Sequence, residues 1–459
     1  MRPTFMTPVR VLWRRRRLEE SCRWTRRQLE DQQQARLQAL RRVALERSPF
    51  YRRFHRGLEQ APLAALPVLT KSELMAQFDD LVTDRAVRLQ DVERYLDRQP
   101  GADLFRDRYV VLATSGSTGR RGVFLYDRDE WLTALAMIAR PMAWARLSGL
   151  RRPPRSALIA SATPWHYSSR LSESLSSRLL PALRISAAEP LPSIVRRLND
   201  WQPESLAVYP SVLKQLADEQ IAGRLRLRLR SVATSGEVLD AETRRAVRRA
   251  WGLPVFDTYG ATEYAPIAAE CAHGRKHLFE DNAIVEVVDD RGRPVPPGVR
   301  GERVLLTVLC RTTQPLIRYE ISDAIRLADA DTACACGRSF AVIESIEGRT
   351  EDTLYFPHRD RGAARVAVHP IVFHDILDTV PTGGWQIRQS GDGLAVSLVG
   401  LHDRSTADGL AASLRRALES RGASVGAVTV GAVDALARGA TGKAPLIVAV
   451  PPASQENFV

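Results

Sequence analysis

Between residues 109 and 251, short apolar runs alternate with segments whose apolar residues recur at helical spacing, and this alternation constrains the fold more than any other feature. Four runs have the length and composition of buried strands, namely residues 109–113, 156–160, 205–209 and 231–234. Residues 211–222 and 240–251 have helical patterns. Strands that alternate with helices form parallel sheets covered by those helices, so the pattern predicts an α/β domain with largely parallel sheets.

The segment that precedes this region is predicted to be helical. Residues 28–47 carry apolar side chains at helical spacing, and the pattern stops at Ser48 and Pro49. Thr70 is followed three residues later by Glu73, which is the spacing of a capping box and predicts another helix start. We therefore expect a helical N-terminal arm over residues 1–95.

The chain changes character after the α/β region. Residues 283–288 and 302–308 predict antiparallel strands joined by a polar turn. Beyond residue 349 a separate pattern predicts strands and one helix, at 386–390, 394–399, 406–421 (the helix) and 426–432. Because 459 residues exceed what one hydrophobic core usually organises, we predict two domains. Residues 1–350 form a large domain with packed sheets and a β-rich subdomain, and residues 351–459 form a small, mobile α+β domain.

The basic charge of the chain gives little evidence for a nucleic-acid partner. The net charge is +13, but the arginines are scattered among acidic residues along most of the sequence. One dense cluster stands near the start, at Arg14, Arg15, Arg16, Arg17, Arg23, Arg26 and Arg27. We interpret it as a solvated arm or a helix start, and a binding arm for nucleic acid or a membrane surface is the alternative. No nucleic-acid partner is expected.

The chain has no apolar run of 18 or more residues, and its basic start lacks the apolar segment of a signal peptide. We therefore expect a soluble cytoplasmic protein without a membrane span. The five cysteines are too few and too unevenly placed for a disulfide scaffold, which favours reduced thiols.

Three of these cysteines, together with nearby histidines, are residue types that bind metal ions. Cys271, His273 and His277 precede Cys334 and Cys336, and Zn²⁺ takes four Cys or His ligands in a tetrahedron. Cys271, His277, Cys334 and Cys336 would make a closed and therefore structural zinc site. Ordinary buried thiols are the alternative.

The segment after the first predicted strand suits a polyphosphate. Residues 114–122 contain four hydroxyl side chains and three glycines, so backbone amides and hydroxyls can approach an anion closely. A flexible Ser/Gly turn is the alternative. The loop is not a Walker loop, because no lysine follows the required glycine pattern.

This loop resembles the phosphate-loop motif of the adenylate-forming superfamily of acyl-CoA ligases. Five further motifs of that superfamily follow in the same order, at residues 234–239 (adenine pocket), 259–263 (YGxTE), 318–323 (RYxxGD), 347–352 (hinge) and 442–443 (C-terminal lysine). A narrower resemblance, to the phenylacetate-CoA ligase and coenzyme F390 synthetase branch, rests on residues 48–51, 66–71 and 334–338.

The resemblance implies a role for particular residues. Asp323 would accept hydrogen bonds from both ribose hydroxyls, Tyr259 would stack on adenine, and Thr262 would donate to the α-phosphate. Glu263 would help to hold Mg²⁺, which prefers hard oxygen ligands. The other nucleotide-binding residues implied are Thr114, Ser115, Gly116, Ser117, Thr118, Gly119, Ser235, Gly236, Glu237, Gly260 and Arg349.

Two further roles concern the reaction and the acid. Lys443 would stabilise the charge that develops between the carboxylate and the α-phosphate, and Glu351 would act as the hinge between the domains. Only four of the 66 basic residues are lysines, so a lysine at 443 is notable. His166 and Tyr167 would lie beside the acid, although an aromatic core cluster explains them equally well.

The reaction implied is ATP-dependent and AMP-forming activation of a carboxylic acid, with an aromatic acid favoured by the resemblance. Transfer of the acyl group to coenzyme A would follow. The alternatives are transfer to an amine or a carrier-protein thiol, an adenylylated product, or an inactive homologue that acts as a basic binding protein. A homodimer is compatible with the sequence.

Overall fold

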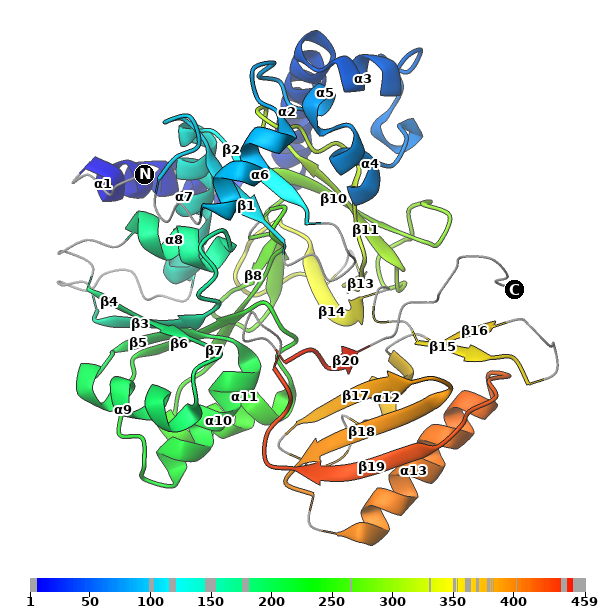
Figure 1. Cartoon of the computed structure of the whole chain (residues 1–459). Helices are drawn as coiled ribbons and strands as arrows, with labels where there is room; N and C mark the ends of the chain where they lie inside the picture. The colour runs from blue at the N-terminus through cyan, green and yellow to red at the C-terminus, as the bar shows by residue number, and fades with distance from the viewer. Residues whose placement is uncertain are drawn as a thin grey trace.

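The computed structural model describes residues 6–98, 103–114, 121–144, 154–175, 181–264, 266–329, 332–349, 352, 354–359, 365–368, 371–377, 380, 382, 384–401, 403–438 and 444–448. Figure 1 shows a larger body formed by the first three quarters of the chain and a smaller body formed by the C-terminal quarter. The mixed α/β class expected from the sequence is confirmed.

Helices form the N-terminal part of the chain. They are α1 (Met6–Glu20), α2 (Arg26–Arg47), α3 (Pro49–Phe54), α4 (Lys71–Ala76), α5 (Phe78–Leu81) and α6 (Leu89–Asp97), with the 3-10 turns η1 (Ser21–Arg23) and η2 (Leu63–Ala65). The predicted helix at 28–47 is α2, and Ser48 ends it before Pro49 begins α3. The capping box of Thr70 and Glu73 is present at the start of α4, as predicted.

Part of the arginine cluster holds these helices to the rest of the large domain. Arg14 Nη1 donates to Thr133 Oγ1 at 2.8 Å on α7 (Arg128–Trp144), and Arg26 forms an ion pair with Glu280 at 2.8 Å. The cluster therefore lies on α1, η1 and α2, and Arg14 and Arg26 contact the rest of the large domain, so it is not wholly a free arm.

A nine-stranded sheet organises the large domain, in the order β13-β14-β9-β8-β7-β6-β5-β3-β4. The strands are β3 (Ser156–Ala160), β4 (Ala182–Ser186), β5 (Ser205–Val208), β6 (Ser231–Ser235), β7 (Val255–Tyr259), β8 (Ala268–Glu270), β9 (Lys276–Leu278), β13 (Asp323–Leu327) and β14 (Val342–Arg349). Neighbours from β4 to β7 are parallel, and those from β7 to β13 are antiparallel. The connecting helices are α8 (Tyr167–Leu175), α9 (Leu191–Trp201), α10 (Pro210–Ile221) and α11 (Ala241–Trp251).

The prediction of largely parallel sheets was wrong for the first apolar run. Residues 109–113 contain β1 (Val110–Ala113), which pairs antiparallel with β2 (Val123–Tyr126) in a separate two-stranded sheet. The connection between β1 and β2 is short, and parallel strands need a crossover of a dozen or more residues. The antiparallel pair β10 (Ala283–Val288) and β11 (Arg303–Val308) confirms the prediction for that region, and β12 (Tyr319–Ile321) adds a third strand.

The C-terminal quarter has a sheet and a core of its own. Its elements are β15 (Leu354–Pro357), β16 (Arg365–Val368), α12 (Ile371–Leu377), β17 (Trp385–Ser390), β18 (Gly393–Val399), α13 (Arg404–Glu419), β19 (Val428–Val433) and β20 (Ile447–Val448). The predicted strands and helix agree with β17, β18, α13 and β19 to within about two residues. Buried apolar side chains from Leu354 to Ile447 form one cluster, distinct from the two clusters of the large domain.

No helix in the described part of the chain has both the length and the apolar character needed to span a membrane.

Candidate active site

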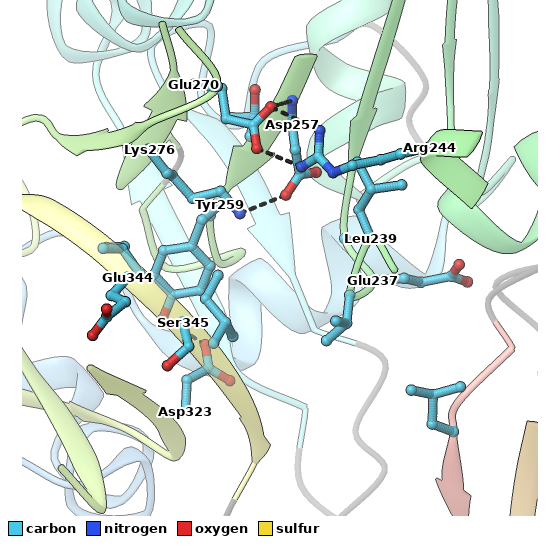
Figure 2. Close-up of a pocket in the computed structure, with 18 of the residues that line it drawn as sticks. Glu237, Leu239, Arg244, Asp257, Tyr259, Glu270, Lys276, Asp323, Glu344 and Ser345 are labelled. Atoms are coloured by element: carbon cyan, nitrogen blue, oxygen red, sulfur yellow. Dashed lines mark hydrogen bonds and ion pairs between the residues drawn. The ribbon is translucent and has the colours of Figure 1, made fainter. Parts of the chain in front are cut away.

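A cavity of about 830 Å³ lies where the large domain meets the segment 444–447 of the small domain. Five of the predicted nucleotide-binding residues line it, namely Gly236, Glu237, Tyr259, Gly260 and Asp323. They come from sequence segments that are far apart, and Figure 2 shows Tyr259 and Asp323 close together on one side. The fold therefore gathers these residues around one space.

Sheet topology explains why the segments meet. Strands β6 and β7 are parallel neighbours, so their carboxyl ends, at Ser235 and Tyr259, reach the same edge of the sheet. Such edges are the usual ligand sites of open α/β sheets. Gly236 follows β6 with φ of 84°, a left-handed conformation that favours glycine. Asp323 opens β13 on the antiparallel side of the same sheet.

Tyr259 and Asp323 form a buried hydrogen-bonded pair. The Tyr259 hydroxyl donates to Asp323 Oδ2 at 2.7 Å, and the two residues are 8% and 6% exposed. An ionised carboxylate offers about four acceptor positions, so the tyrosine orients the group and leaves capacity for further donors. This is suitable geometry for the predicted ribose contact.

A charged wall of the cavity was not predicted from the sequence. Lys276 Nζ lies 2.5 Å from Asp257 Oδ2, and Thr234 Oγ1 donates to Asp257 Oδ1 at 2.8 Å. Arg244 forms an ion pair with Glu270, whose carboxylate also accepts from the backbone N–H of Asp257 at 3.1 Å. Burial raises the pKa of Glu270 although Arg244 opposes the shift. Figure 2 shows these ion pairs.

Two signals in the sequence could have identified that wall. Asp257 stands two residues before Tyr259 on one strand and therefore faces the same side of the sheet. Lys276 is one of only four lysines in the chain.

Thr262 and Glu263 are not among the residues that line the cavity. Glu263 Oε1 accepts from the Tyr319 hydroxyl at 3.2 Å, and its backbone carbonyl accepts from Tyr126 Oη at 2.9 Å and Arg311 Nη1 at 2.6 Å. Arg311 is 1% exposed, so a buried cation fixes the turn that follows β7.

The predicted phosphate loop is described only at its base. Thr114 N donates to the Gly122 carbonyl at 2.9 Å, and Gly122 N donates to Thr114 Oγ1 at 2.8 Å. The residues between them that were predicted to bind phosphate lie outside the described residues, and they are Ser115, Gly116, Ser117, Thr118 and Gly119.

Three other predicted residues are described incompletely or lie outside the described part. Lys443 and the hinge residue Glu351 lie outside it. Arg349 is described only as backbone, where it pairs with Asp323 across β13 and β14. Ala444, which follows Lys443 in the chain, lines the cavity.

His166 and Tyr167 do not line this cavity. The Tyr167 ring packs edge-on against Trp131 at a centroid distance of 5.5 Å, and Trp131 packs in the same way against Tyr126. Burial raises the pKa of Tyr167 well above its ordinary value. Tyr167 thus belongs to an aromatic cluster, in agreement with the alternative interpretation, and the predicted contact with the acid remains untested.

The four residues predicted to bind zinc come together. The ligand atoms of Cys271, His277, Cys334 and Cys336 all lie within 4.8 Å of one another, and His273 is not part of the group. His277 Nδ1 lies 3.1 Å from the Phe340 carbonyl, so it carries the proton and its Nε2, 3.2 Å from Cys336 Sγ, is the acceptor nitrogen. Burial lowers the pKa of His277, which favours the neutral ring.

Comparisons with known proteins agree with the geometry. Residues 56–307 match the model of a family described as AMP-binding enzyme. A phenylacetate-coenzyme A ligase from Thermus thermophilus is 28% identical over 370 residues, which cover 76% of this chain and 75% of that protein. A phenylacetate-coenzyme A ligase from Pseudomonas putida is 28% identical over 256 residues, covering 53% of this chain and 55% of its own.

Among solved structures, a 2-hydroxyisobutyryl-CoA ligase in the postadenylation state superposes with a TM-score of 0.70. It is 20% identical, and the match covers 94% of this chain and 92% of that chain. At this identity the likeness establishes a shared fold.

Proposed function

Because the chain belongs to the AMP-binding enzyme family, within the adenylate-forming superfamily and its phenylacetate-CoA ligase-like branch, we propose that it is an AMP-forming acid–CoA ligase. A carboxylate oxygen of the acid attacks the α-phosphorus of ATP, and pyrophosphate leaves. The coenzyme A sulfur then attacks the acyl carbon of the adenylate, the thiol proton passes to solvent, and AMP leaves with the electron pair of the acyl–oxygen bond.

One observation carries this proposal beyond the family match. Motif residues that follow β6 or lie on β7 and β13 meet at a single cavity, and the residue that follows Lys443 lines the same cavity from the small domain. Its volume of about 830 Å³ lies within the usual range for small-molecule and cofactor sites. Such an arrangement suits a nucleotide, and it brings the chain neighbour of the proposed catalytic lysine to the same space.

Individual residues have roles in the proposed first step. Asp323, oriented by Tyr259, holds the ribose, and the Tyr259 ring lies against the adenine. Glu263 supplies a carboxylate for Mg²⁺, whose charge would stabilise the phosphate oxygens, and Thr262 donates to the α-phosphate. Lys443 stabilises the charge that develops between the attacking carboxylate and the α-phosphate.

We propose an aromatic acid as the substrate, because the two relatives above are phenylacetate-coenzyme A ligases. The test is pyrophosphate release over a panel of aromatic and aliphatic acids, with and without coenzyme A, followed by mass spectrometry of the products. Release that requires an acid, together with an acyl-CoA product, supports the proposal. An amide or a stable adenylate in place of the thioester would identify another acceptor.

A variant separates catalysis from folding. Lys443→Ala should abolish acid-dependent pyrophosphate release, while Lys214→Ala, which removes a lysine paired with Asp218 on α10, should retain it. Release that survives in Lys443→Ala would overturn the role of this lysine.

We further propose that Cys271, His277, Cys334 and Cys336 hold a structural zinc ion. The Cys271 and Cys334 sulfurs are 3.7 Å apart, close to the edge of about 3.8 Å expected for a tetrahedron with Zn–S bonds of about 2.3 Å. The hydrogen bond of His277 Nδ1 to the Phe340 carbonyl leaves Nε2 as the metal ligand, as in many zinc sites.

Such a site would tie the turn between β8 and β9 to the segment that precedes β14. Four protein ligands leave no open position, so the ion would stabilise structure and not take part in the reaction. Metal analysis of the purified protein should find about one zinc per chain. Cys334→Ser should lose the metal and have a lower melting temperature. Cys22→Ser should keep the metal and the wild-type melting temperature. Protein that neither contains zinc nor is stabilised by added zinc would contradict the proposal.

A further inference from the structure

The segment that carries Lys443 is held at both of its ends by one side chain of the small domain. Gln386 on β17 is 5% exposed, and its Nε2 donates to the Ala437 carbonyl at 2.9 Å and to the Pro445 carbonyl at 2.8 Å. Two bonds from one buried amide bring the start and the end of this segment together. The base of the segment is therefore fixed within the small domain.

The large domain holds the same segment through Glu237. Glu237 Oε1 accepts from the backbone N–H of Ala444 at 2.9 Å, and Ala444 is 4% exposed. The carboxylate is itself positioned by Ser211 at the start of α10, whose backbone N–H and hydroxyl lie 2.9 and 3.2 Å from its two oxygens. In Figure 2 the Glu237 carboxylate points away from Tyr259 and Asp323, toward the C-terminal segment drawn in red.

Arg438 makes a second connection between the two domains. Its Nη2 donates to Gln215 Oε1 at 2.9 Å and its Nη1 donates to Ser211 Oγ at 3.3 Å, both on α10. Burial lowers the pKa of Arg438, and the nearby carboxylate of Glu237 opposes the shift. Glu237 and Arg438 thus reach across the domain boundary in opposite directions and meet at Ser211.

We propose that Glu237 and Arg438 form a latch that holds the Lys443 segment against the large domain during adenylation. Both are positioning residues that act through Lys443, and this inference rests on the proposed function. Ala444 is the next residue in the chain after Lys443, so the bond from Ala444 to Glu237 acts directly beside the proposed catalytic lysine. Glu237 then serves the docking of the domains and not only the nucleotide pocket to which its motif belongs.

The latch has a consequence for the second step. Its bonds join two domains, so any reorientation of the small domain for thioester formation must break them. The latch should therefore favour adenylation selectively and contribute nothing to transfer of the acyl group to coenzyme A.

The test measures the two half-reactions separately with an acid that the wild type activates. The first is acid-dependent pyrophosphate release, and the second is acyl-CoA formation from the synthetic acyl adenylate and coenzyme A. Arg438→Gln should lower kcat of the first about 10-fold or more, because hydrogen bonds to a charged group are lost. The KM for ATP and the rate of the second half-reaction should stay unchanged.

Arg421→Gln is the matched control, because the Arg421 guanidinium donates to the Ala417 carbonyl within its own domain. It should leave both half-reactions at wild-type rates. Gln215→Ala removes an acceptor of the latch from the large domain and should reduce the first half-reaction in the same direction, but less.

An unchanged first half-reaction in Arg438→Gln, or an equal loss in both half-reactions, would overturn the latch. Wild-type protein that releases no pyrophosphate with any acid would instead overturn the proposed function, so the two failures are distinguishable.

Discussion

Replacement of Asp323 by Asn tests the nucleotide site most directly, because it keeps the shape of the side chain and removes its charge. The carboxylate accepts a hydrogen bond from the Tyr259 hydroxyl at 2.7 Å. The two oxygens of a carboxylate together offer about four acceptor positions, which suits contact with both ribose hydroxyls. An amide has one oxygen, and its nitrogen is a donor that cannot accept from a hydroxyl. The variant therefore loses one ribose bond and weakens the other.

The expected effect follows from the energy of such bonds. A hydrogen bond to a charged group contributes about 1.5–3 kcal/mol, so we expect a loss of about 2–3 kcal/mol, which is about 30- to 150-fold in the KM for ATP. The ribose does not react, so its contacts stabilise substrate and transition state alike and kcat should change little.

The assay is acid-dependent pyrophosphate release over a range of ATP concentrations. Asp290→Asn, at an exposed position in the turn after β10, is the matched control and should behave as wild type. An unchanged KM for ATP in folded Asp323→Asn protein would refute the ribose contact. A large fall in kcat alone would instead place Asp323 in the chemical step.

Three predictions concern stability. Lys276→Met leaves the Asp257 carboxylate, whose side chain is 6% exposed, without its cation. In urea titrations the variant should lower the free energy of unfolding by about 3 kcal/mol or more. A change below about 1 kcal/mol would mean that water screens the ion pair. Arg140→Leu leaves the buried Asp281 carboxylate without its cation, although the Ser21 hydroxyl still donates to it at 2.6 Å. The variant should lower the free energy of unfolding by about 3–5 kcal/mol, and the double variant with Asp281→Leu should recover most of that loss if the ion pair is the cause. Burial lowers the pKa of His55 from 6.5 to about 4. Between these two pH values His55 is protonated in the unfolded chain and neutral in the folded chain. The free energy of unfolding should therefore fall as pH falls from about 6.5 to about 4. In His55→Phe the melting temperature should depend less steeply on pH across that window, and equal slopes would contradict the assignment.

Local sequence signals predicted the elements well where one signal decides the structure. The capping box of Thr70 starts α4, Ser48 and Pro49 end α2, and the alternating runs mark β3, β5 and β6. The first apolar run was misread because periodicity shows that a strand is buried but not which partner it takes. The short connection to β2 made β1 half of a hairpin.

Some residues of the candidate site could likewise be predicted from the sequence, and others could not. Short motifs identified Gly236, Tyr259 and Asp323, because glycine conformation and side-chain chemistry are properties of single residues. The grouping of Cys271 with Cys334 could also be predicted from residue types, because few residue types bind zinc. The bond of Tyr259 to Asp323 was not, because hydrogen-bond partners depend on how strands are ordered in the sheet.

What the sequence determined by itself was therefore the class of chemistry, because the residues that bind phosphate, ribose and metal must be of particular types at particular spacings. Only the tertiary structure decided which side chains face the cavity and which join the domains. It paired Lys276 of β9 with Asp257 of β7 and turned Glu237 toward Ala444. These contacts link residues far apart in the chain, and their geometry comes from packing, which no local pattern records.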